Sequence, residues 1–148
     1  MANTILLPVD LNSSDGDLGS LRAALPLLEA GAVLHVLAVL PDFGLPSVSI
    51  QFDRDFVQKL HREAHEQMAK WIAANIPEGI TVEPHIQVGT VYDQILRTAD
   101  RLGVDLIVVG AHRPELSDYL IGSNAARVVR HAKQSVYVVR RPYRRAGN

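Results

Sequence analysis

Short apolar runs alternate with segments of helical periodicity along almost the whole chain. Five runs are rich in Val, Ile and Leu and lie between turn-forming residues, which is typical of strands buried on both faces. The runs occupy residues 5–9, 33–39, 80–88, 104–109 and 136–139. The pattern therefore predicts five strands, of which the third alternates only loosely between apolar and polar positions.

The segments between these runs carry apolar residues every three or four positions, which predicts amphipathic helices. The segments are residues 18–28, 53–75, 89–102 and 123–133. We expect the first helix to be kinked at Pro26, because proline removes a backbone donor, and to end at Gly31. Residues 42–52 show no clear period and are expected to form a loop.

The helices also have predicted ends and core-facing positions. We expect Thr90 to cap the third helix, with Asp93 three residues later, and Gly103 to end it. The positions expected to face the core are Phe56, Leu60, Ala64, Met68 and either Trp71 or Ile72, then Val91, Ile95, Ala99 and Leu102, and finally Ala125, Val128, Val129 and Ala132.

The alternation of strands and helices predicts an α/β domain with one open, parallel, five-stranded sheet and four helices on both faces. Right-handed crossovers with the first strand at the centre give the strand order 3-2-1-4-5. Open sheets of this kind bind ligands where the strand order reverses, here between the carboxyl ends of strands one and four, at Asp10 and Gly110. We assign residues 1–141 to this domain and residues 142–148 to a basic, solvated tail.

The residues expected at this edge suit an anion. Gly110 ends a strand, and Gly122 and Ser123 open a helix whose first backbone N–H groups lack intrahelical partners. A phosphate could bind there, and the Asp10 carboxylate could accept from a ribose or adenine group or help to hold a metal ion. Simpler roles are open as well, since Gly110 could form a plain turn while Ser123 and Asp10 could cap backbone groups.

Composition excludes several classes of protein. The chain has 148 residues and no cysteine, which excludes disulfides, thiolate metal sites and a cysteine nucleophile. Its formal net charge of −1 gives no general attraction for nucleic acid. There is no Walker A sequence, and the glycines follow the fourth strand, whereas a dinucleotide fingerprint follows the first. No apolar run is long enough for a membrane span and no signal peptide is visible, so we expect a cytoplasmic protein.

The remaining histidines give no strong signal. His61 and His65 have metal-ligand spacing on a helix, but Glu63 falls at the wrong offset for a metalloprotease motif and a solvated face is favoured. His35 lies within an apolar strand and is expected to be a satisfied core or boundary histidine. No nucleophile has an obvious base beside it, so we predict no metal site and no dedicated enzyme.

Three stretches together carry a resemblance to a known family. They are ILLPVD at residues 5–10, LAVLP at residues 37–41, and VVGAHR at residues 108–113 followed by LIGSNAARVVRHA at residues 120–132. With these stretches the chain resembles the universal stress protein family over nearly its whole length. The family signature is Gly, two residues, Gly, nine residues, Gly and then Ser or Thr. Here Arg113 stands at the second glycine and eight residues separate it from Gly122, as in the subset with His-Arg-Pro followed by Gly-Ser-Asn.

The resemblance implies an adenine nucleotide ligand, usually ATP, with Mg²⁺ left open as a companion ion. Adenine is expected beside Val9 and Val39, ribose near Asp10, and phosphates near the glycine loop and the following helix. The full set of expected contact residues is Pro8, Val9, Asp10, Val39, Gly110, His112, Arg113, Gly122, Ser123 and Asn124. At most slow ATP hydrolysis is expected, with a metal-bound water at Asp10.

The resemblance also implies a homodimer joined through the last strand, formed by Val136, Tyr137, Val138 and Val139. An apolar edge strand of this kind favours pairing with a second strand on physical grounds as well.

The first functional hypothesis is a nucleotide-dependent regulatory or stress-response protein that acts through conformation and an unidentified protein partner. The alternative is a dimeric interaction module that does not bind nucleotide, which the departure at Arg113 favours. An adenylate-forming or hydrolytic enzyme is disfavoured.

Overall fold

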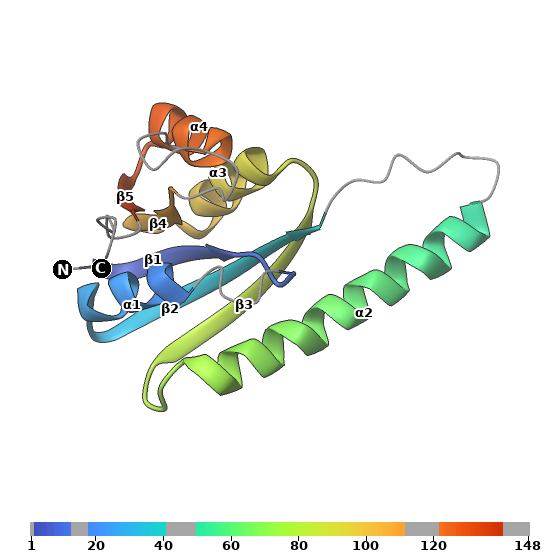
Figure 1. Cartoon of the computed structure of the whole chain (residues 1–148), viewed down its shortest axis with the longest axis horizontal. Coiled ribbons are helices and arrows are strands. Elements are labelled where there is room, and N and C mark those ends of the chain that lie inside the picture. The colour runs from blue at the N-terminus through green and yellow to red at the C-terminus, as the bar shows by residue number, and fades with distance from the viewer. Residues whose placement is uncertain (1, 13–17, 41–49, 112–121, 141–148) are drawn as a thin grey trace, which may run out of the picture.

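The computed structural model describes residues 2–12, 18–40, 50–111 and 122–140 of the chain, and they form one five-stranded parallel sheet with helices on both faces (Figure 1). The strands are β1 (Ala2–Val9), β2 (Leu28–Leu40), β3 (Thr81–Val88), β4 (Leu106–Gly110) and β5 (Ser135–Val139). Their order is β3-β2-β1-β4-β5, with every pair parallel. The predicted fold class and strand order are therefore confirmed.

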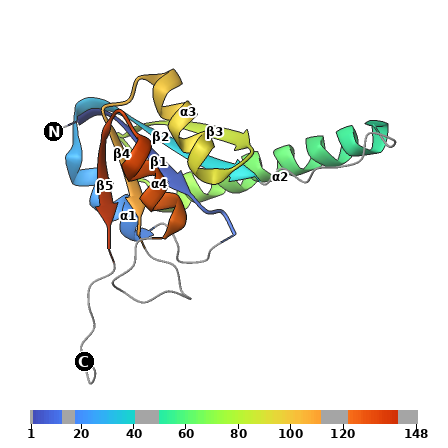
Figure 2. The ribbon, with the colours of Figure 1, turned by 90° about the horizontal axis from the view of Figure 1, so that it is seen from above.

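Helices cover both faces of this sheet, as Figures 1 and 2 show. They are α1 (Leu18–Ala24), the short 3-10 helix η1 (Leu25–Leu27), α2 (Ile50–Asn75), α3 (Val91–Leu102) and α4 (Ser123–His131). The first two α-helices pack on one face and the last two on the other, which gives two separate hydrophobic cores. No helix in the described part of the chain is both long and apolar enough to cross a membrane.

The central strand β1 contributes to both cores because successive side chains point to opposite faces of a sheet. Ile5 and Leu7 belong to the core under α1 and α2, whereas Leu6 belongs to the core under α3 and α4. All three side chains have no exposed surface. Burial of each contributes about 1.5–3 kcal/mol relative to an exposed position, so β1 anchors the sheet from both sides.

The first helix is shorter than predicted, and Gly31 does not end it. The α-helix stops at Ala24, and Pro26 lies at the start of the 3-10 turn, where its missing N–H breaks the helical hydrogen-bond ladder. Strand β2 then begins at Leu28, five residues before the predicted start. Gly31 lies inside β2, in a segment where the register against β1 shifts. Its φ of 78° is a left-handed backbone conformation, which is typical of an irregular segment within a strand.

The predicted helix ends were partly right. Gly103 closes α3 in the left-handed conformation, as expected. Thr90 is the N-cap residue, but its side chain makes no capping hydrogen bond, and Asp93 instead pairs with Arg97 at 2.8 Å. Helix α2 begins at Ile50, three residues earlier than predicted, so only residues 42–49 of the expected loop remain, and these lie outside the described residues.

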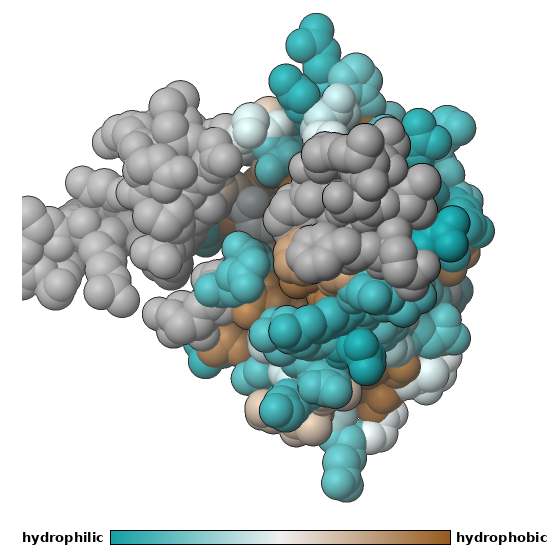
Figure 3. All heavy atoms as spheres, turned by 90° about the vertical axis from the view of Figure 1, so that its right-hand side faces the viewer, coloured by the Kyte–Doolittle hydropathy of each residue, from teal (hydrophilic) through white to brown (hydrophobic). Residues whose placement is uncertain are grey.

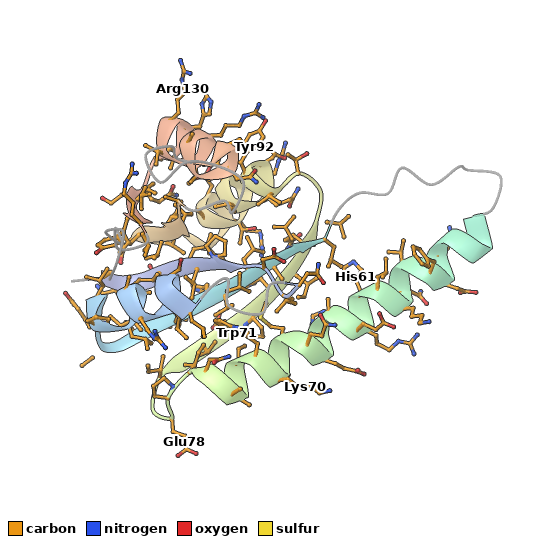
Figure 4. The ribbon with its side chains drawn as sticks, viewed as in Figure 1. His61, Lys70, Trp71, Glu78, Tyr92 and Arg130 are labelled. Carbon is orange, nitrogen blue, oxygen red and sulfur yellow. The ribbon has the colours of Figure 1, made fainter. Side chains whose placement is uncertain are left out.

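Three predicted core positions are wrong. Phe56, Val91 and Val129 are 37%, 39% and 47% exposed. The first half of α2 extends beyond the sheet in Figure 1, so Phe56 lies away from the core, whereas Met68 in the second half is buried. Trp71 is half-buried and packs against the core under α1 and α2. Figure 4 labels it on the second half of α2. Helical periodicity alone did not reveal where the sheet beneath a helix ends.

Candidate functional site

The carboxyl edge between β1 and β4 is the place where the sheet is least continuous. The pairing between these strands consists of Ile5 with Leu106 and Leu6 with Ile107. On either side the ladders run further, because β1 pairs with β2 up to Val9 and β4 pairs with β5 up to Gly110. The two central strands therefore stop pairing before their carboxyl ends, at the point where the strand order reverses and open sheets bind ligands.

The amino ends of the same two strands are tied together. The Asp105 carboxylate, just before β4, accepts the backbone N–H groups of Asn3 and Thr4 at 3.1 and 3.2 Å. The Asp105 N–H in turn donates to the carbonyl oxygen of Thr4 at 3.1 Å. The strands are thus clamped at one end and separate at the other, which fixes the direction in which the edge opens.

Asp10 lies immediately after β1 and is exposed. Its Oδ1 accepts the backbone N–H of Asn12 at 2.9 Å, which is the geometry of an Asx turn. This hydrogen bond orients the carboxylate at the end of the central strand. The local capping role that we left open for Asp10 is therefore present, and the exposed carboxylate still faces solvent at this edge.

The two apolar residues expected beside adenine, Val9 and Val39, lie on opposite sides of the sheet. Val9 is 7% exposed and packs in the core under α1 and α2, whereas Val39 packs against the core under α3 and α4. Pro8 is half-buried one residue earlier. The side chains of Val9 and Val39 thus point to opposite faces, so these residues can meet a common ligand only through their backbone groups at the strand ends.

Gly110 is the last residue of β4 and packs closely against α1. A Cβ atom added there would lie 3.2 Å from Oγ of Ser20, a contact that is tighter than nearly all natural Cβ contacts. Ser20 is only 4% exposed, so it has little room to move. The missing side chain at Gly110 therefore lets helix α1 approach the strand, whatever else its backbone does at the edge.

The two ends of the segment after β4 are joined at Ala111. Its N–H donates to the Val139 carbonyl oxygen at 2.9 Å, and its own carbonyl oxygen accepts the Gly122 N–H at 3.0 Å. Ala111 is 3% exposed, which fixes both ends beside the sheet. His112 and Arg113, two of the expected contact residues, lie outside the described residues.

Helix α4 begins at this junction. Gly122 is the N-cap residue and its carbonyl oxygen accepts the Ala126 N–H at 2.9 Å, so Ser123 is the first helical residue and does not cap the helix. No side chain of the cap residue satisfies the first turn, and the Ser123 side chain is exposed. The positive end of the α4 dipole therefore faces the carboxyl edge, and the N-cap glycine offers no side-chain cap.

Asn124 links α4 to the start of α3. Its Oδ1 accepts the Tyr92 backbone N–H at 3.2 Å, and the guanidinium of Arg127 lies over the Tyr92 ring, 4.7 Å from its centroid. Figure 4 shows Tyr92 where α3 and α4 meet. The Asn124 side chain thus supplies the cap that Thr90 does not, and it brings the amino ends of two helices to the same edge.

Apolar surface also reaches this side of the molecule. Figure 3 shows the side of the molecule toward which β2 and β3 point. Brown apolar groups are visible there among teal polar ones. Val88 at the end of β3 and Val91 at the start of α3 are 38% and 39% exposed. Exposed apolar groups therefore lie close in sequence to the amino end of α3 on this side of the molecule.

The structure brings together a second polar group that the sequence analysis missed. His35 of β2 lies against Glu83 and His85 of β3, on the strand pair next to β1 and separate from the β1–β4 edge. The signal was available in part, because Glu83 and His85 alternate on a strand and so share a face. What the sequence did not supply was the register that places His35 opposite Glu83.

Comparison with known proteins shows which proteins this chain is similar to. The model of the universal stress protein family matches residues 1–140. Universal stress protein G of Escherichia coli O157:H7 is 35% identical over 144 residues, which cover 95% of this chain and 100% of that protein.

Solved structures show the same architecture. The structure of MJ0577, a universal stress protein of Methanocaldococcus jannaschii, aligns with a TM-score of 0.79 and 27% identity over 96% of this chain and 98% of that one. A universal stress protein from Archaeoglobus fulgidus, solved in complex with dAMP, aligns with a TM-score of 0.63 and 25% identity over 93% of this chain and 97% of that one.

Proposed function

The chain belongs to the universal stress protein family, and from that premise we propose that it binds an adenine nucleotide, ATP, at the carboxyl edge between β1 and β4. The observation that carries the proposal is the early end of the β1–β4 ladder beside the first turn of α4, whose N-cap glycine offers no side-chain cap. The relative solved with dAMP supports the ligand class, since its fold and this one superimpose over most of both chains.

In this proposal the base and ribose lie on the β1 and β2 side of the edge. Backbone groups of Val9 and Val39 contact adenine, because their side chains are used by the two cores. Pro8 limits the flexibility of the strand that precedes the site, since its φ is fixed. The Asp10 carboxylate, oriented by its bond from the Asn12 N–H, accepts a ribose hydroxyl.

The phosphates lie at the start of α4. The backbone N–H groups of Ser123 and Asn124 and the exposed Ser123 hydroxyl donate to phosphate oxygens, and the helix dipole favours the negative charge. The proposal also assigns phosphate contacts to the Gly110 backbone, to the Cα of Gly122, whose N–H is held by the Ala111 carbonyl oxygen, to His112 and to the Arg113 guanidinium. Mg²⁺ would accompany the phosphates, as it does for most ATP sites.

Binding, and not turnover, is the proposed activity. Occupancy of the site would order the surface around α4, and a protein partner would read that surface. We also propose a homodimer through β5, because this strand lies at the edge of the sheet and its Tyr137 side chain is 45% exposed. Hydrolysis of bound ATP is expected to be slow at most.

The experiment is a nucleotide assay on the purified protein, followed by calorimetric titration with Mg·ATP. We expect adenine nucleotide to be released on denaturation, and a saturable heat of binding once the protein has been stripped of it. Absence of both would contradict the proposal.

A charge substitution tests the phosphate position. Ser123→Asp places a carboxylate in the first turn of α4, where the dipole stabilises the helix but the charge repels phosphate. We expect unchanged or raised thermal stability together with at least about tenfold weaker ATP binding, equivalent to about 1.4 kcal/mol. Ser123→Ala is the matched control and should lose less affinity. Wild-type affinity in Ser123→Asp would remove the proposed phosphate site.

The second candidate function is a dimeric interaction module that binds no nucleotide. Two observations favour it, because Gly110 is explained by its packing against Ser20 and the Asn124 side chain is occupied by Tyr92. This candidate predicts a dimer in solution and no response to ATP. Sedimentation of the protein with and without Mg·ATP, run beside the calorimetry, separates the two functions.

A further inference from the structure

The outer strand pair β2–β3 carries a compact group of three side chains with nitrogen and oxygen donors, His35, Glu83 and His85. In the register of the two strands, His35 lies opposite Glu83, and Leu37 lies opposite His85. Side chains two residues apart on a strand share a face, so all three project from the same side of the sheet. Since Leu37 packs in the core under α3 and α4, this is the face that those helices cover.

The donor atoms converge on one point. His35 Nδ1 lies 2.9 Å from His85 Nε2 and 3.3 Å from Glu83 Oε2, and all three donor atoms lie within 4.8 Å of one another. Tetrahedral zinc, with bonds of roughly 2.0–2.2 Å to nitrogen and oxygen, places its ligand atoms about 3.3–3.5 Å apart. The His35–Glu83 distance already fits such an ion, and the two imidazole nitrogens must move apart by a few tenths of an ångström.

The surroundings allow an ion to enter and the ligands to receive it. The His35 side chain is 8% exposed, whereas the Glu83 side chain is 55% exposed, so the group is buried at one end and open to solvent at the other. Burial lowers the pKa of both His35 and His85, which keeps the imidazoles in the neutral form that binds metal.

The charges around the group have opposite signs. The carboxylate of Glu83 attracts a cation, and the guanidinium of Arg101, from the last turn of α3, acts on both histidines in the opposite direction. Arg101 is exposed and therefore screened by solvent, whereas the Glu83 carboxylate lies 3.3 Å from His35 Nδ1. The local balance favours a divalent cation over an anion.

We propose that His35, Glu83 and His85 form a site for a divalent transition metal of the zinc type, with a fourth position open to water. The two-histidine, one-carboxylate set is one that binds Zn²⁺ with an exchangeable ligand. An ion there joins β2 to β3 through side chains as well as backbone. The competing explanation is a hydrogen bond between the two imidazoles, whose rings are 5.1 Å apart and inclined by 39°. Both explanations use the same contact, so only metal titration separates them.

The experiment uses the full chain in the absence of nucleotide. A chelator first removes bound metal, and the chelator is then removed. Addition of ZnCl₂ is expected to give one binding event by calorimetry and to raise the melting temperature by about 5 °C or more at a hundredfold excess over Kd. Co²⁺ in place of Zn²⁺ is expected to give the visible absorption of a tetrahedral ion. Absence of any thermal shift with Zn²⁺ would overturn the proposal.

Paired variants locate the ion. Glu83→Gln and His85→Gln remove one ligand each at positions that are not deeply buried, and each is expected to weaken Zn²⁺ binding about tenfold or more while the protein stays folded. The matched control is His61→Gln with His65→Gln on α2, where the two rings lie 6.4 Å apart at a spacing that also suits metals. The control should retain wild-type affinity. Loss of binding in the control, or its retention in both ligand variants, would overturn the proposal.

Discussion

The β1–β4 pair and the β2–β3 pair are held together in opposite ways. Two residue pairs join β1 to β4, and the strands then separate toward their carboxyl ends. The β2–β3 ladder is continuous from Val33 with Thr81 to Leu40 with Val88. A ligand that needs backbone N–H groups finds them at the first pair, because backbone groups that are not paired within the sheet are available there. At the second pair only side chains are available, and the fixed register makes them converge.

This difference also decides what maintains each pair. With little backbone pairing, β1 and β4 depend on side-chain packing and on the Asp105 clamp at their amino ends. The β2–β3 pair has a backbone hydrogen-bond ladder along its length. The side-chain contacts of His35 with Glu83 and His85 are therefore additional to this backbone pairing. The predictions that follow test this division, from the largest expected effect to the smallest.

Truncation of a core residue at the last β1–β4 pair should have the largest effect. Leu6 is fully buried in the core under α3 and α4 and pairs with Ile107. Leu6→Ala is expected to lower the free energy of unfolding by about 2–5 kcal/mol, through lost burial and the cavity left behind. Urea denaturation measures it, and Val129→Ala, at a position 47% exposed, is the control with a change within about 0.5 kcal/mol. A change of that small size for Leu6→Ala would mean that packing does not hold this pair.

The close approach of α1 to β4 gives the next largest effect. Gly110→Ala places a methyl group 3.2 Å from Oγ of Ser20 and should destabilise the protein by about 1–3 kcal/mol. Ser20→Ala removes that oxygen, so the cost of Gly110→Ala should fall in this background, which a double-mutant cycle measures. An equal cost in both backgrounds would show that the glycine is required for another reason.

The cap that α3 receives from α4 should contribute less. Asn124→Ala removes the acceptor of the Tyr92 N–H and is expected to cost about 1 kcal/mol in thermal or chemical denaturation. Ser123→Ala should be nearly neutral, because Gly122 occupies the N-cap position of α4. The reverse order of the two effects would contradict the cap geometry described here.

The clamp at the amino ends should have the smallest effect. Asp105→Asn keeps one acceptor for Asn3 or Thr4 but loses the charge, and the exposed position limits the cost to roughly 0.5–1 kcal/mol. ATP affinity should not change, because the clamp lies at the opposite end of the strands. Normal stability together with weakened ATP binding in this variant would indicate that ATP binds at the amino ends of β1 and β4, which would contradict the proposed site.

Much of the fold could be predicted because the strands are nearly continuous apolar runs, which identify a parallel sheet covered on both faces. The first helix could not be delimited, since the effect of Pro26 is a change to a 3-10 turn followed directly by β2. The projecting part of α2 was also hidden, because the period of a helix does not state how far the sheet below it extends.

The residues at the β1–β4 edge and the group around His35 also differed in how well the sequence could predict them. Asp10, Gly110 and Gly122 lie at the ends of elements, where residue type and chain order suffice to predict their place at one edge. His35 lies in the middle of a strand, and its neighbours come from a strand about fifty residues later, as the separation from His85 in the hydrogen bond shows. Only the register, which the sequence does not display, joins them.

The central claim is that ATP binds where β1 and β4 separate, and amide chemical shifts in a labelled sample titrated with Mg·ATP test it most directly. The account predicts the largest shifts at the carboxyl edge, in the amides of Asn12, Ala111, Gly122 and Ser123, and small shifts at Asn3 and Thr4. Saturable shifts centred on Asn3 and Thr4, or no saturable shift at Gly122 and Ser123, would contradict it.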